Sequence, residues 1–314
     1  MPRVIVCVAA NPSIDKLFEV ERLRVGEIHR PVAFVQVPGG KGLNVARAAH
    51  ALGAEVTATG ILAGHAGRWV ADALAAEGVR GAFVWAEGET RASLSVADRA
   101  GGGLTEFYET GTAVGAEDWG LLEARVAELA SSAAWITLSG SVPPGTPEDG
   151  YARLVRIGVR AGVPVALDAR DDALAGALAE GPSLVKVNAE EAATLLGAPL
   201  STAEEARAAA AEIRARLPRG GAAIVTRGAE GAVAALPDGD VVLGRLYVRG
   251  PYPVGSGDAF LGGLVTALER GDGWPEALRL ALGAAAANAE LPGAGRLDPS
   301  RARALAELAE LRPS

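Results

Sequence analysis

PYPVGSGDAFLGGL, residues 251–264, places two glycines and one serine directly ahead of a run of small and apolar residues. Gly255 and Gly257 can adopt backbone angles that other residues avoid, so successive N–H groups can point at one place. The run that follows predicts a helix, and the N-terminus of a helix adds partial positive charge. The stretch therefore predicts an anion-binding turn, Gly255-Ser256-Gly257, at the start of a helix.

Asp258 lies in the first turn of that predicted helix and has two interpretations. As an acid at a helix N-terminus it would stabilise the fold by a few tenths of a kcal/mol up to about 1 kcal/mol. As a catalytic base it would take a hydroxyl proton beside the turn that holds a phosphoryl group. The stretch on its own slightly favours the structural interpretation.

A second glycine turn, PGGKGLNVA at residues 38–46, also precedes a predicted helix and presents Lys41 and Asn44. It is not a Walker loop, because Lys41 is followed by Gly42 rather than by serine or threonine. Neither turn matches the GxGxxG fingerprint, since position 260 is phenylalanine. The missing fingerprint disfavours a nicotinamide oxidoreductase.

Lysine and asparagine are rare in this chain, which has three lysines among 30 basic residues and four asparagines. Lys41 and Asn44 share the second glycine turn, and Lys186 and Asn188 share the end of one predicted strand. This clustering favours a functional role for the four residues over an accident of composition.

The composition limits the class of protein. Hydrophobic residues make up 49% of the 314 residues, enough for a sizeable core, and the net charge of −8 argues against nucleic acid as a partner. Cys7 is the single cysteine, so no internal disulfide can form, and a reducing cytoplasm is expected. Neither a signal peptide nor an apolar run of about 18 residues is found, so no membrane partner is expected.

Apolar strand-like runs alternate with helix-like runs along most of the chain. Strands are predicted at 3–10, 55–63, 133–141, 163–169, 183–188, 221–226 and 231–236. Helices are predicted from the second glycine turn to Gly53 and at 66–79, 147–162, 201–217, 257–270, 275–289 and 299–311. Buried, non-alternating strands between helices predict one α/β domain, residues 1–314, with a largely parallel sheet covered on both faces.

Two regions depart from this alternation. Residues 16–38 and 82–109 show β-type runs with no intervening helix. They predict a small antiparallel sheet that stands off the main one and serves as a lid.

Seven motifs occur in the order seen in the ribokinase-like, phosphofructokinase-B family of carbohydrate kinases, and the chain resembles that family nearly end to end. The motifs are NPSID (11–15), GGKGLNVAR (39–47), ETR (89–91), SGSVPPGTP (139–147), KVNAEE (186–191), TRGAEG (226–231) and VGSGDAFLGG (254–263). NPSID, GGKGLNVAR and GEIHR (26–30) are most similar to the hexose-phosphate branch, which includes 1-phosphofructokinase and tagatose-6-phosphate kinase. The resemblance implies a three-layer α/β sandwich and transfer of the γ-phosphoryl group of ATP to a hydroxyl.

The resemblance also implies roles for individual residues. Asp258 corresponds to the general base, and Gly255, Ser256 and Gly257 correspond to the anion hole. The expected acceptor-binding residues are Asp15, Gly39, Gly40, Lys41, Asn44, Arg91 and Ser139. The expected ATP-binding residues are Lys186, Asn188, Thr226, Gly228, Gly231 and Asn288, the last facing the adenosine. Glu191 is expected to order Mg²⁺ through water, so ATP and Mg²⁺ are the implied cofactors, and pairing of two lids implies a homodimer.

Asn188 also has a simpler interpretation, as the cap of the helix that follows it. Four lid residues depart from the family pattern: His29, Ser93, Tyr108 and Thr112. They leave the identity of the acceptor open.

The alternatives are a kinase of an unphosphorylated sugar or nucleoside, and a nucleotide-binding sensor without catalysis. The cationic side chains of Lys41, Arg30 and Arg91 favour a phosphorylated acceptor, and retention of Asp258 disfavours the sensor.

Overall fold

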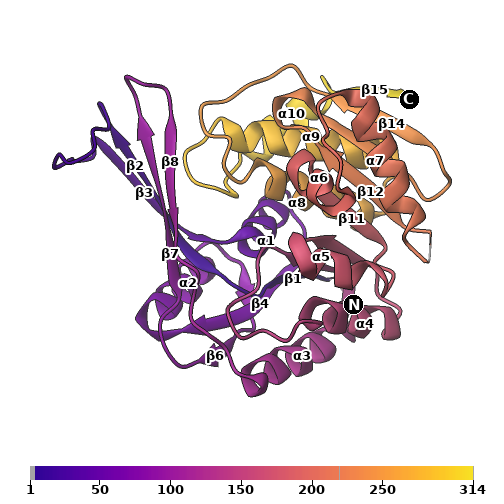
Figure 1. Cartoon of the computed structure of the whole chain (residues 1–314), viewed down its shortest axis with the longest axis horizontal. Helices are drawn as coiled ribbons and strands as arrows, with labels where there is room; N and C mark the ends of the chain where they lie inside the picture. The colour runs from indigo at the N-terminus through magenta and orange to yellow at the C-terminus, as the bar shows by residue number, and fades with distance from the viewer. Residues whose placement is uncertain (1–3, 219, 314) are drawn as a thin grey trace.

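The computed structural model of the protein describes residues 4–218 and 220–313 and contains two β-sheets (Figure 1). Of the predicted domain, residues 1–3, 219 and 314 lie outside the described residues. The 11 strands of the larger sheet are β1 (Val4–Ala9), β4 (Val56–Ala63), β5 (Arg80–Gly81), β6 (Val84–Ala86), β9 (Ala133–Ser139), β10 (Val165–Asp168), β11 (Leu184–Asn188), β12 (Ala222–Thr226), β13 (Ala232–Ala235), β14 (Val241–Arg245) and β15 (Glu310–Pro313).

The strands of the larger sheet run in the order β15-β14-β13-β12-β11-β10-β9-β1-β4-β5, and β6 pairs with the far end of β4. Pairing is parallel from β12 through β1 to β5, and antiparallel among β12, β13, β14 and β15. A parallel sheet is normally covered on both faces, so both faces of its strands are apolar. In β1, Ile5 and Cys7 pack into the core on one face of the sheet, and Val6 and Val8 pack into the core on the other.

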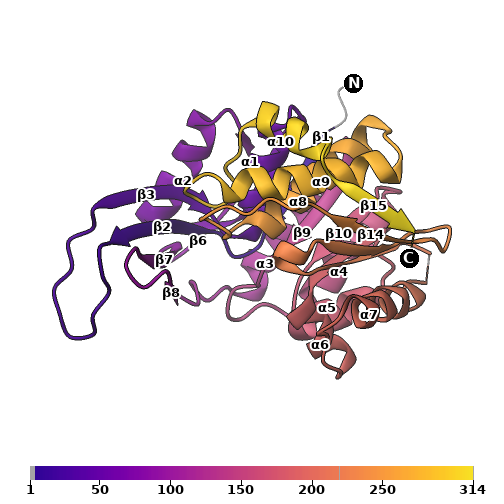
Figure 2. The same cartoon turned by 90° about the horizontal axis from the view of Figure 1, so that it is seen from above.

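Helices cover both faces of the larger sheet (Figure 2). One layer contains α1 (Lys41–Ala51), α2 (Gly64–Ala76), α8 (Ser256–Arg270), α9 (Trp274–Ala289) and α10 (Pro299–Ala306). The other contains α3 (Ala116–Ala130), α4 (Gly150–Arg160), α5 (Asp171–Leu178), α6 (Ala189–Leu196) and α7 (Ala203–Ala215). This three-layer arrangement around a mostly parallel sheet confirms the predicted fold class.

The predicted helix at 299–311 is wrong at its C-terminal end. The helix, α10, ends at Ala306, and Glu310–Pro313 instead forms strand β15 against β14. The edge of β14 offers backbone hydrogen bonds that the last residues satisfy, and a proline is tolerated in such an edge strand. Within residues 4–218 and 220–313, no helix has both the length and the apolar character of a membrane span.

The smaller sheet projects from the body of the molecule (Figure 1). Its strands, in the order β3-β2-β7-β8, are β3 (Ala33–Gly39), β2 (Ser13–Val20), β7 (Arg91–Asp98) and β8 (Leu104–Tyr108). A separate small sheet was predicted, and its two outer pairs are antiparallel.

Two details of that prediction need correction. The central pair, β2 and β7, is parallel, because the chain passes through β3, α1, β4 and α2 between them, and such a long crossover permits parallel pairing. The second lid segment also begins later than residue 82, because β6 at Val84–Ala86 pairs with β4 of the larger sheet.

Candidate active site

A cleft of about 1610 Å³ lies between the smaller sheet and the carboxyl ends of the parallel strands. Ligands of open α/β sheets bind at this edge. The predicted residues that line the cleft are Asp15, Gly40, Lys41, Asn44, Arg91, Ser139, Lys186, Asn188, Glu191, Thr226, Gly228, Gly231, Gly255, Ser256, Gly257 and Asp258. Gly39 and Asn288 do not line it.

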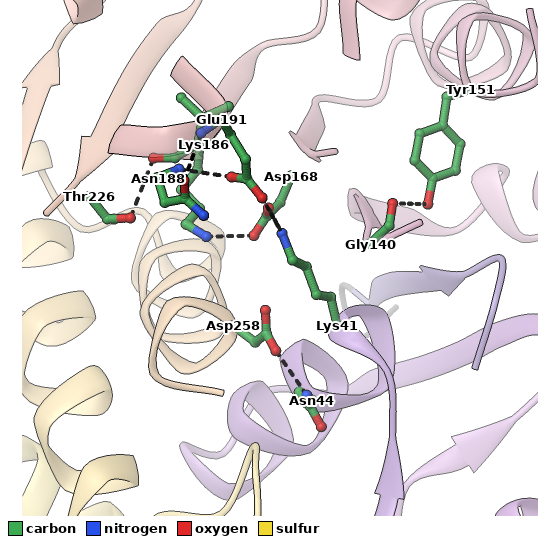
Figure 3. Close-up of polar contacts among 11 residues, drawn as sticks. Lys41, Asn44, Gly140, Tyr151, Asp168, Lys186, Asn188, Glu191, Thr226 and Asp258 are labelled. Carbon is green, nitrogen blue, oxygen red and sulfur yellow. Dashed lines mark hydrogen bonds and ion pairs between the residues drawn. The ribbon is translucent and has the colours of Figure 1, made fainter. Parts of the chain in front are cut away.

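Two lysines that line the cleft, Lys41 and Lys186, hold one buried carboxylate between them (Figure 3). Asp168, at the end of β10, accepts hydrogen bonds from Lys41 Nζ at 3.0 Å and Lys186 Nζ at 2.7 Å. Burial alone would raise the pKa of Asp168, but the charges of Lys186 and Lys41 outweigh it and lower that pKa. The carboxylate therefore stays ionised although its side chain is fully buried.

Lys41 joins this pair to a second carboxylate. Its Nζ lies 2.8 Å from Glu191 Oε1 as well as close to Asp168. Burial opposes the charge of Lys41, but Asp168, Glu191 and then Asp258 together raise its pKa. Lys41 thus reaches from the glycine turn at the start of α1 across to the strands on the other side of the cleft.

Asp258 lies in the first turn of α8 and is 6% exposed. Asn44 Nδ2 donates a hydrogen bond to its Oδ2 at 2.8 Å (Figure 3). Burial first, and then the negative charge of Asp168, raise the pKa of Asp258 from 3.8 to about 7, against the opposing charges of Lys41 and Lys186. A carboxyl group with a near-neutral pKa at the floor of a cleft is suited to accept a proton.

In the turn ahead of Asp258, Gly255 has the predicted left-handed backbone, whereas Gly257 lies within α8 and lacks a positive φ. Gly255 has a φ of 82°, and a Cβ there would lie 2.8 Å from the Cα of Ala294, so no other residue fits. A Cβ on Gly257 would lie 3.0 Å from Lys186 Nζ, which places that ammonium group against the turn. The positive end of α8 and a lysine therefore converge on one point of the cleft.

Asn288 requires a correction. The resemblance placed it on the ATP side, facing the adenosine, but its side chain is fully buried beneath the anion-binding turn. Its Nδ2 donates to Val254 O at 2.9 Å and to Ser256 Oγ at 3.3 Å. Its Oδ1 accepts from the amide of Gly295 at 2.8 Å. Its polar atoms are thus engaged within the protein.

The part of the cleft where the resemblance implies acceptor binding is built around Asp15 on β2. Its carboxylate accepts from Ser13 Oγ at 2.6 Å and from the Gly40 amide at 3.4 Å. A Cβ on Gly39 would lie 2.0 Å from Asp15 Cγ, so Gly39 acts by making room for this carboxylate. Burial is the largest influence on Asp15 and raises its pKa, whereas the two hydrogen bonds and Arg91 lower it.

Arg91 on β7 lies beside this group. Its Nε and Nη2 donate to Asn11 O at 3.3 and 3.2 Å, and its Nη1 donates to Ser93 Oγ at 3.2 Å. Ser93 pairs across the smaller sheet with Asp15 on one side and with Tyr108 on the other. One position that departs from the family pattern, Ser93, thus adjoins Asp15, and a second, Tyr108, adjoins Ser93.

On the opposite side of the cleft, Asn188 and Glu191 form a capping box at the start of α6. The Glu191 amide donates to Asn188 Oδ1 and the Asn188 amide donates to Glu191 Oε2, both at 2.8 Å. The capping interpretation of Asn188 is therefore correct for the structure, while Glu191 also binds Lys41. Thr226, whose Oγ1 donates to Val187 O at 3.3 Å, ends β12 nearby.

Sequence reasoning missed Asp168, which holds the two lysines. The sequence does contain an indication of its role, because Asp168 is the last residue of the buried strand VALD. Functional side chains of parallel sheets lie at the carboxyl ends of the strands. Its partners are 127 and 18 residues away along the chain, so their convergence was not visible in the sequence.

A sequence model of pfkB family carbohydrate kinases matches residues 5–301. The chain belongs to the pfkB family of carbohydrate kinases. A 1-phosphofructokinase of Rhodobacter capsulatus is 33% identical to this kinase over 286 residues, which cover 88% of this chain and 87% of that protein. The predicted family and the predicted enzyme class, a carbohydrate kinase, are thereby confirmed.

Solved structures agree on the fold of the kinase. Phosphofructokinase-2 from Escherichia coli in complex with potassium superposes with a TM-score of 0.90 at 28% identity, covering 98% of this chain and 99% of that one. A ribokinase of Arabidopsis thaliana complexed with ribose and ATP gives a TM-score of 0.76 at 21% identity, covering 98% and 99%. The fold is therefore ribokinase-like.

Replacing Asp258 by asparagine is expected to stabilise the kinase at neutral and alkaline pH. An unfolded Asp258 loses its proton near 3.8, whereas the folded residue keeps its proton up to about pH 7. The native state therefore loses stability as the pH rises from about 4 through 7, by at most about 4 kcal/mol for a pKa difference of this size. Thermal unfolding of Asp258→Asn should show a higher Tm than the wild type at pH 8, and a smaller gain at pH 5.

The exposed Asp272, which follows α8, provides the control. Asp272→Asn should leave the Tm within about 1 °C of the wild type at both pH values, as surface substitutions usually do. A lower Tm for Asp258→Asn than for the wild type at pH 8 would mean that the ionised carboxylate stabilises the fold.

Proposed function

We propose that the protein is an ATP-dependent kinase that phosphorylates a hydroxyl of a hexose phosphate, as 1-phosphofructokinase or tagatose-6-phosphate kinase does. The observation that carries the proposal is Asp258, a carboxyl group with a pKa of about 7 beside a helix N-terminus and two lysines. The name of the Rhodobacter capsulatus relative, 1-phosphofructokinase, supports a phosphorylated acceptor.

In the proposed reaction Asp258 accepts the proton of the attacking hydroxyl as the γ-phosphoryl group moves in line between two oxygens. Charge on the moving group is stabilised by the N-terminus of α8, the Gly257 amide and the ammonium groups of Lys186 and Lys41. The amides of Ser256 and Asp258 already donate to Pro253 and Gly255. Gly257 is therefore the central donor of the proposed anion hole.

The nucleotide is proposed to lie along Thr226, Gly228 and Gly231, where the cleft continues past β12. Mg²⁺ would arrive with ATP and offset the charge of its phosphates. Glu191 fits an indirect role toward this ion, because its carboxylate oxygens already accept from Lys41 and from the Asn188 amide. Each oxygen keeps a further lone pair for a magnesium-bound water.

The acceptor is proposed to lie between Asp15 and Asp258, with its hydroxyls on Asp15 and its phosphate toward Arg91. Arginine suits a phosphate because its guanidinium can donate two parallel hydrogen bonds. Gly40, Asn44 and Ser139 line the same part of the cleft.

The kinase function is tested by ADP release with fructose 1-phosphate, fructose 6-phosphate, tagatose 6-phosphate, fructose and ribose as acceptors. A hexose phosphate is expected to support the highest kcat/KM. The best acceptor is then used with Asp258→Asn, whose kcat should fall roughly 10²–10⁴-fold because the basic oxygen is lost. ATP affinity, measured by calorimetry on the same preparation, should persist.

Asp272→Asn serves again as the control and should keep wild-type turnover. Retained kcat in Asp258→Asn would falsify the assignment of the base. Turnover with fructose or ribose alone would favour the kinase of an unphosphorylated sugar, and ATP binding without turnover on any acceptor would favour the sensor.

The smaller sheet is proposed to act as a lid, since the inner faces of its strands carry Asp15 and Arg91 into the cleft. Its backbone amides should exchange hydrogen faster than those of β1 and β9 in the free enzyme. Adding the best acceptor should slow exchange in the smaller sheet and leave β1 and β9 unchanged. Equal exchange in the smaller sheet with and without the acceptor would argue against a lid.

We also propose that two copies pair through the outer face of this sheet. Phe18 and Phe34 pack there with ring centroids 5.2 Å apart, and Phe107 pairs across the strands with Leu94. Phe34 and Phe107 are 54% and 60% exposed, so a second copy would bury apolar surface. Self-association also occurs in a relative, since one structure of Escherichia coli phosphofructokinase-2 is described as a tetrameric inhibited form.

Sedimentation velocity at micromolar concentration should show a dimer for the wild type and a monomer for Phe107→Asp, because a charge would be desolvated in the interface. Leu121→Asp on α3 is the matched control, since Leu121 is 50% exposed on a different part of the surface. It should remain dimeric. A monomeric wild type, or loss of the dimer in both variants, would exclude this interface.

A further inference from the structure

We propose that Asn288 is a positioning residue for phosphoryl transfer: its buried amide sets the geometry of the anion-binding turn, Gly255-Ser256-Gly257, without touching substrate. The proposal rests on the proposed kinase function of that turn. It concerns an element, α9, that the mechanism above does not use.

The side chain of Asn288 connects three points of the backbone and side chains around it. Nδ2 reaches Val254 O at 2.9 Å and Ser256 Oγ at 3.3 Å, and Oδ1 receives the Gly295 amide at 2.8 Å. Because Asn288 is fully buried, loss of the amide would leave these groups to find other partners. One side chain thus joins the residues on both sides of Gly255 to the loop after α9 that contains Ala294 and Gly295.

This loop packs between Asn44 on α1 and Gly255 in the anion-binding turn. A Cβ on Gly295 would lie 2.7 Å from the Cα of Asn44, and a Cβ on Gly255 would lie 2.8 Å from the Cα of Ala294. Asn44 is the residue whose amide binds Asp258. A shift of the loop would therefore move the anion-binding turn and the proposed base relative to each other.

Arg47 fixes the other side of the same loop. Its Nη1 donates to Ala294 O at 2.6 Å and to Pro38 O, just ahead of the acceptor-side glycine turn, at 3.4 Å. Its Nε and Nη2 bind the carboxylate of Glu77 at 2.6 and 2.9 Å. The loop thus contacts the turn at Gly255 directly and is linked through Arg47 to the segment ahead of the second glycine turn. Asn288 connects the loop to α9 by its hydrogen bond with the Gly295 amide.

In this arrangement Asn288 sets the position of the anion-hole donors and does not contribute to the affinity for the acceptor. An anion hole works only when its donors are placed for the transition state, and misplacement by about 1 Å can cost roughly 100-fold in rate. Asp15 and Arg91, the proposed acceptor contacts, lie on β2 and β7 of the smaller sheet, and the side chain of Asn288 bonds to neither of them. Loss of the amide should therefore lower kcat and leave the acceptor KM nearly unchanged.

The test compares Asn288→Ala with Thr266→Val, a matched loss of a buried hydrogen bond. Thr266 is fully buried on α8 and donates to Gly262 O at 2.7 Å, and it does not line the cleft. Both variants should have a lower Tm than the wild type. Asn288→Ala should lose about 10- to 100-fold in kcat with an acceptor KM within about twofold. Thr266→Val should keep kcat within about twofold.

A second measurement reads the anion-binding turn directly. Aluminium fluoride with MgADP supplies an anion in place of the transferring phosphoryl group, and it should tighten MgADP binding to the wild type and to Thr266→Val. In Asn288→Ala this gain should disappear, while affinity for MgADP alone stays within about twofold. Should Asn288→Ala fail to fold, Asn288→Ser, which fills more of the space, is compared with Thr266→Val in the same two measurements.

The outcomes separate the two proposals. Absence of wild-type turnover overturns the proposed function, and the role of Asn288 with it. Wild-type turnover with equal kcat and equal aluminium fluoride gain in the Asn288 variant and Thr266→Val overturns the role of Asn288 alone. A rise in the KM for MgATP with unchanged kcat would also overturn the positioning role, and would indicate that Asn288 supports the nucleotide site instead.

Discussion

Asp168 carries a negative charge at a fully buried position, held between the ammonium groups of Lys41 and Lys186. Removing such charges from water costs several kcal/mol per ion, and the cost is recovered only when partners and geometry are complete. The partners come from α1 on one side of the cleft and from β11 on the other. The position of β10 beside β11, and the packing of α1 against β1, are therefore preconditions of the site.

The same negative charge acts on Asp258 in the opposite sense. It attracts the lysines, yet it is one of the causes that raise the pKa of Asp258. Burial is the largest cause of the near-neutral pKa of Asp258, and the negative charge of Asp168 adds to it, while the two lysines oppose both. The environments of the two acids thus shift their pKa values in opposite directions. Asp168 stays ionised and holds the lysines, whereas Asp258 is suited to accept a proton.

Much of this architecture was visible in the sequence, and the reasons are local. The apolar strands could be predicted because both faces of the sheet are covered, as the alternation of Ile5 and Val6 between two cores shows. The two glycine turns could be predicted because their backbone angles exclude other residues. The rarity of lysine and asparagine pointed to four side chains of the site, and three of them lie in one bonded network around Asp168 and Glu191.

What the sequence could not show depends on contacts between distant segments. The pairing of Asp168 with Lys41 is such a contact, and so is the strand β15, which forms because the edge of β14 is available. The direction of Asn288 is a third case, since helical spacing alone did not separate a side chain facing the cleft from one facing the turn beneath it. Helices α3, α5 and α6 were also missed, and two of these are only eight residues long.

The parallel pairing of β2 with β7 has a consequence for the order of folding. β3, α1, β4 and α2 lie between these two strands in the sequence. Pairing of β2 with β7 therefore closes a long loop and should form late in folding. Until then β2 and β3 form a lone hairpin, which is marginally stable in water. The aromatic pair Phe18 and Phe34 would meanwhile stand on an unsupported ribbon with open edges. During synthesis, the free edge of β2 and the aromatic pair are therefore open to aggregation in the interval between the emergence of β3 and that of β7.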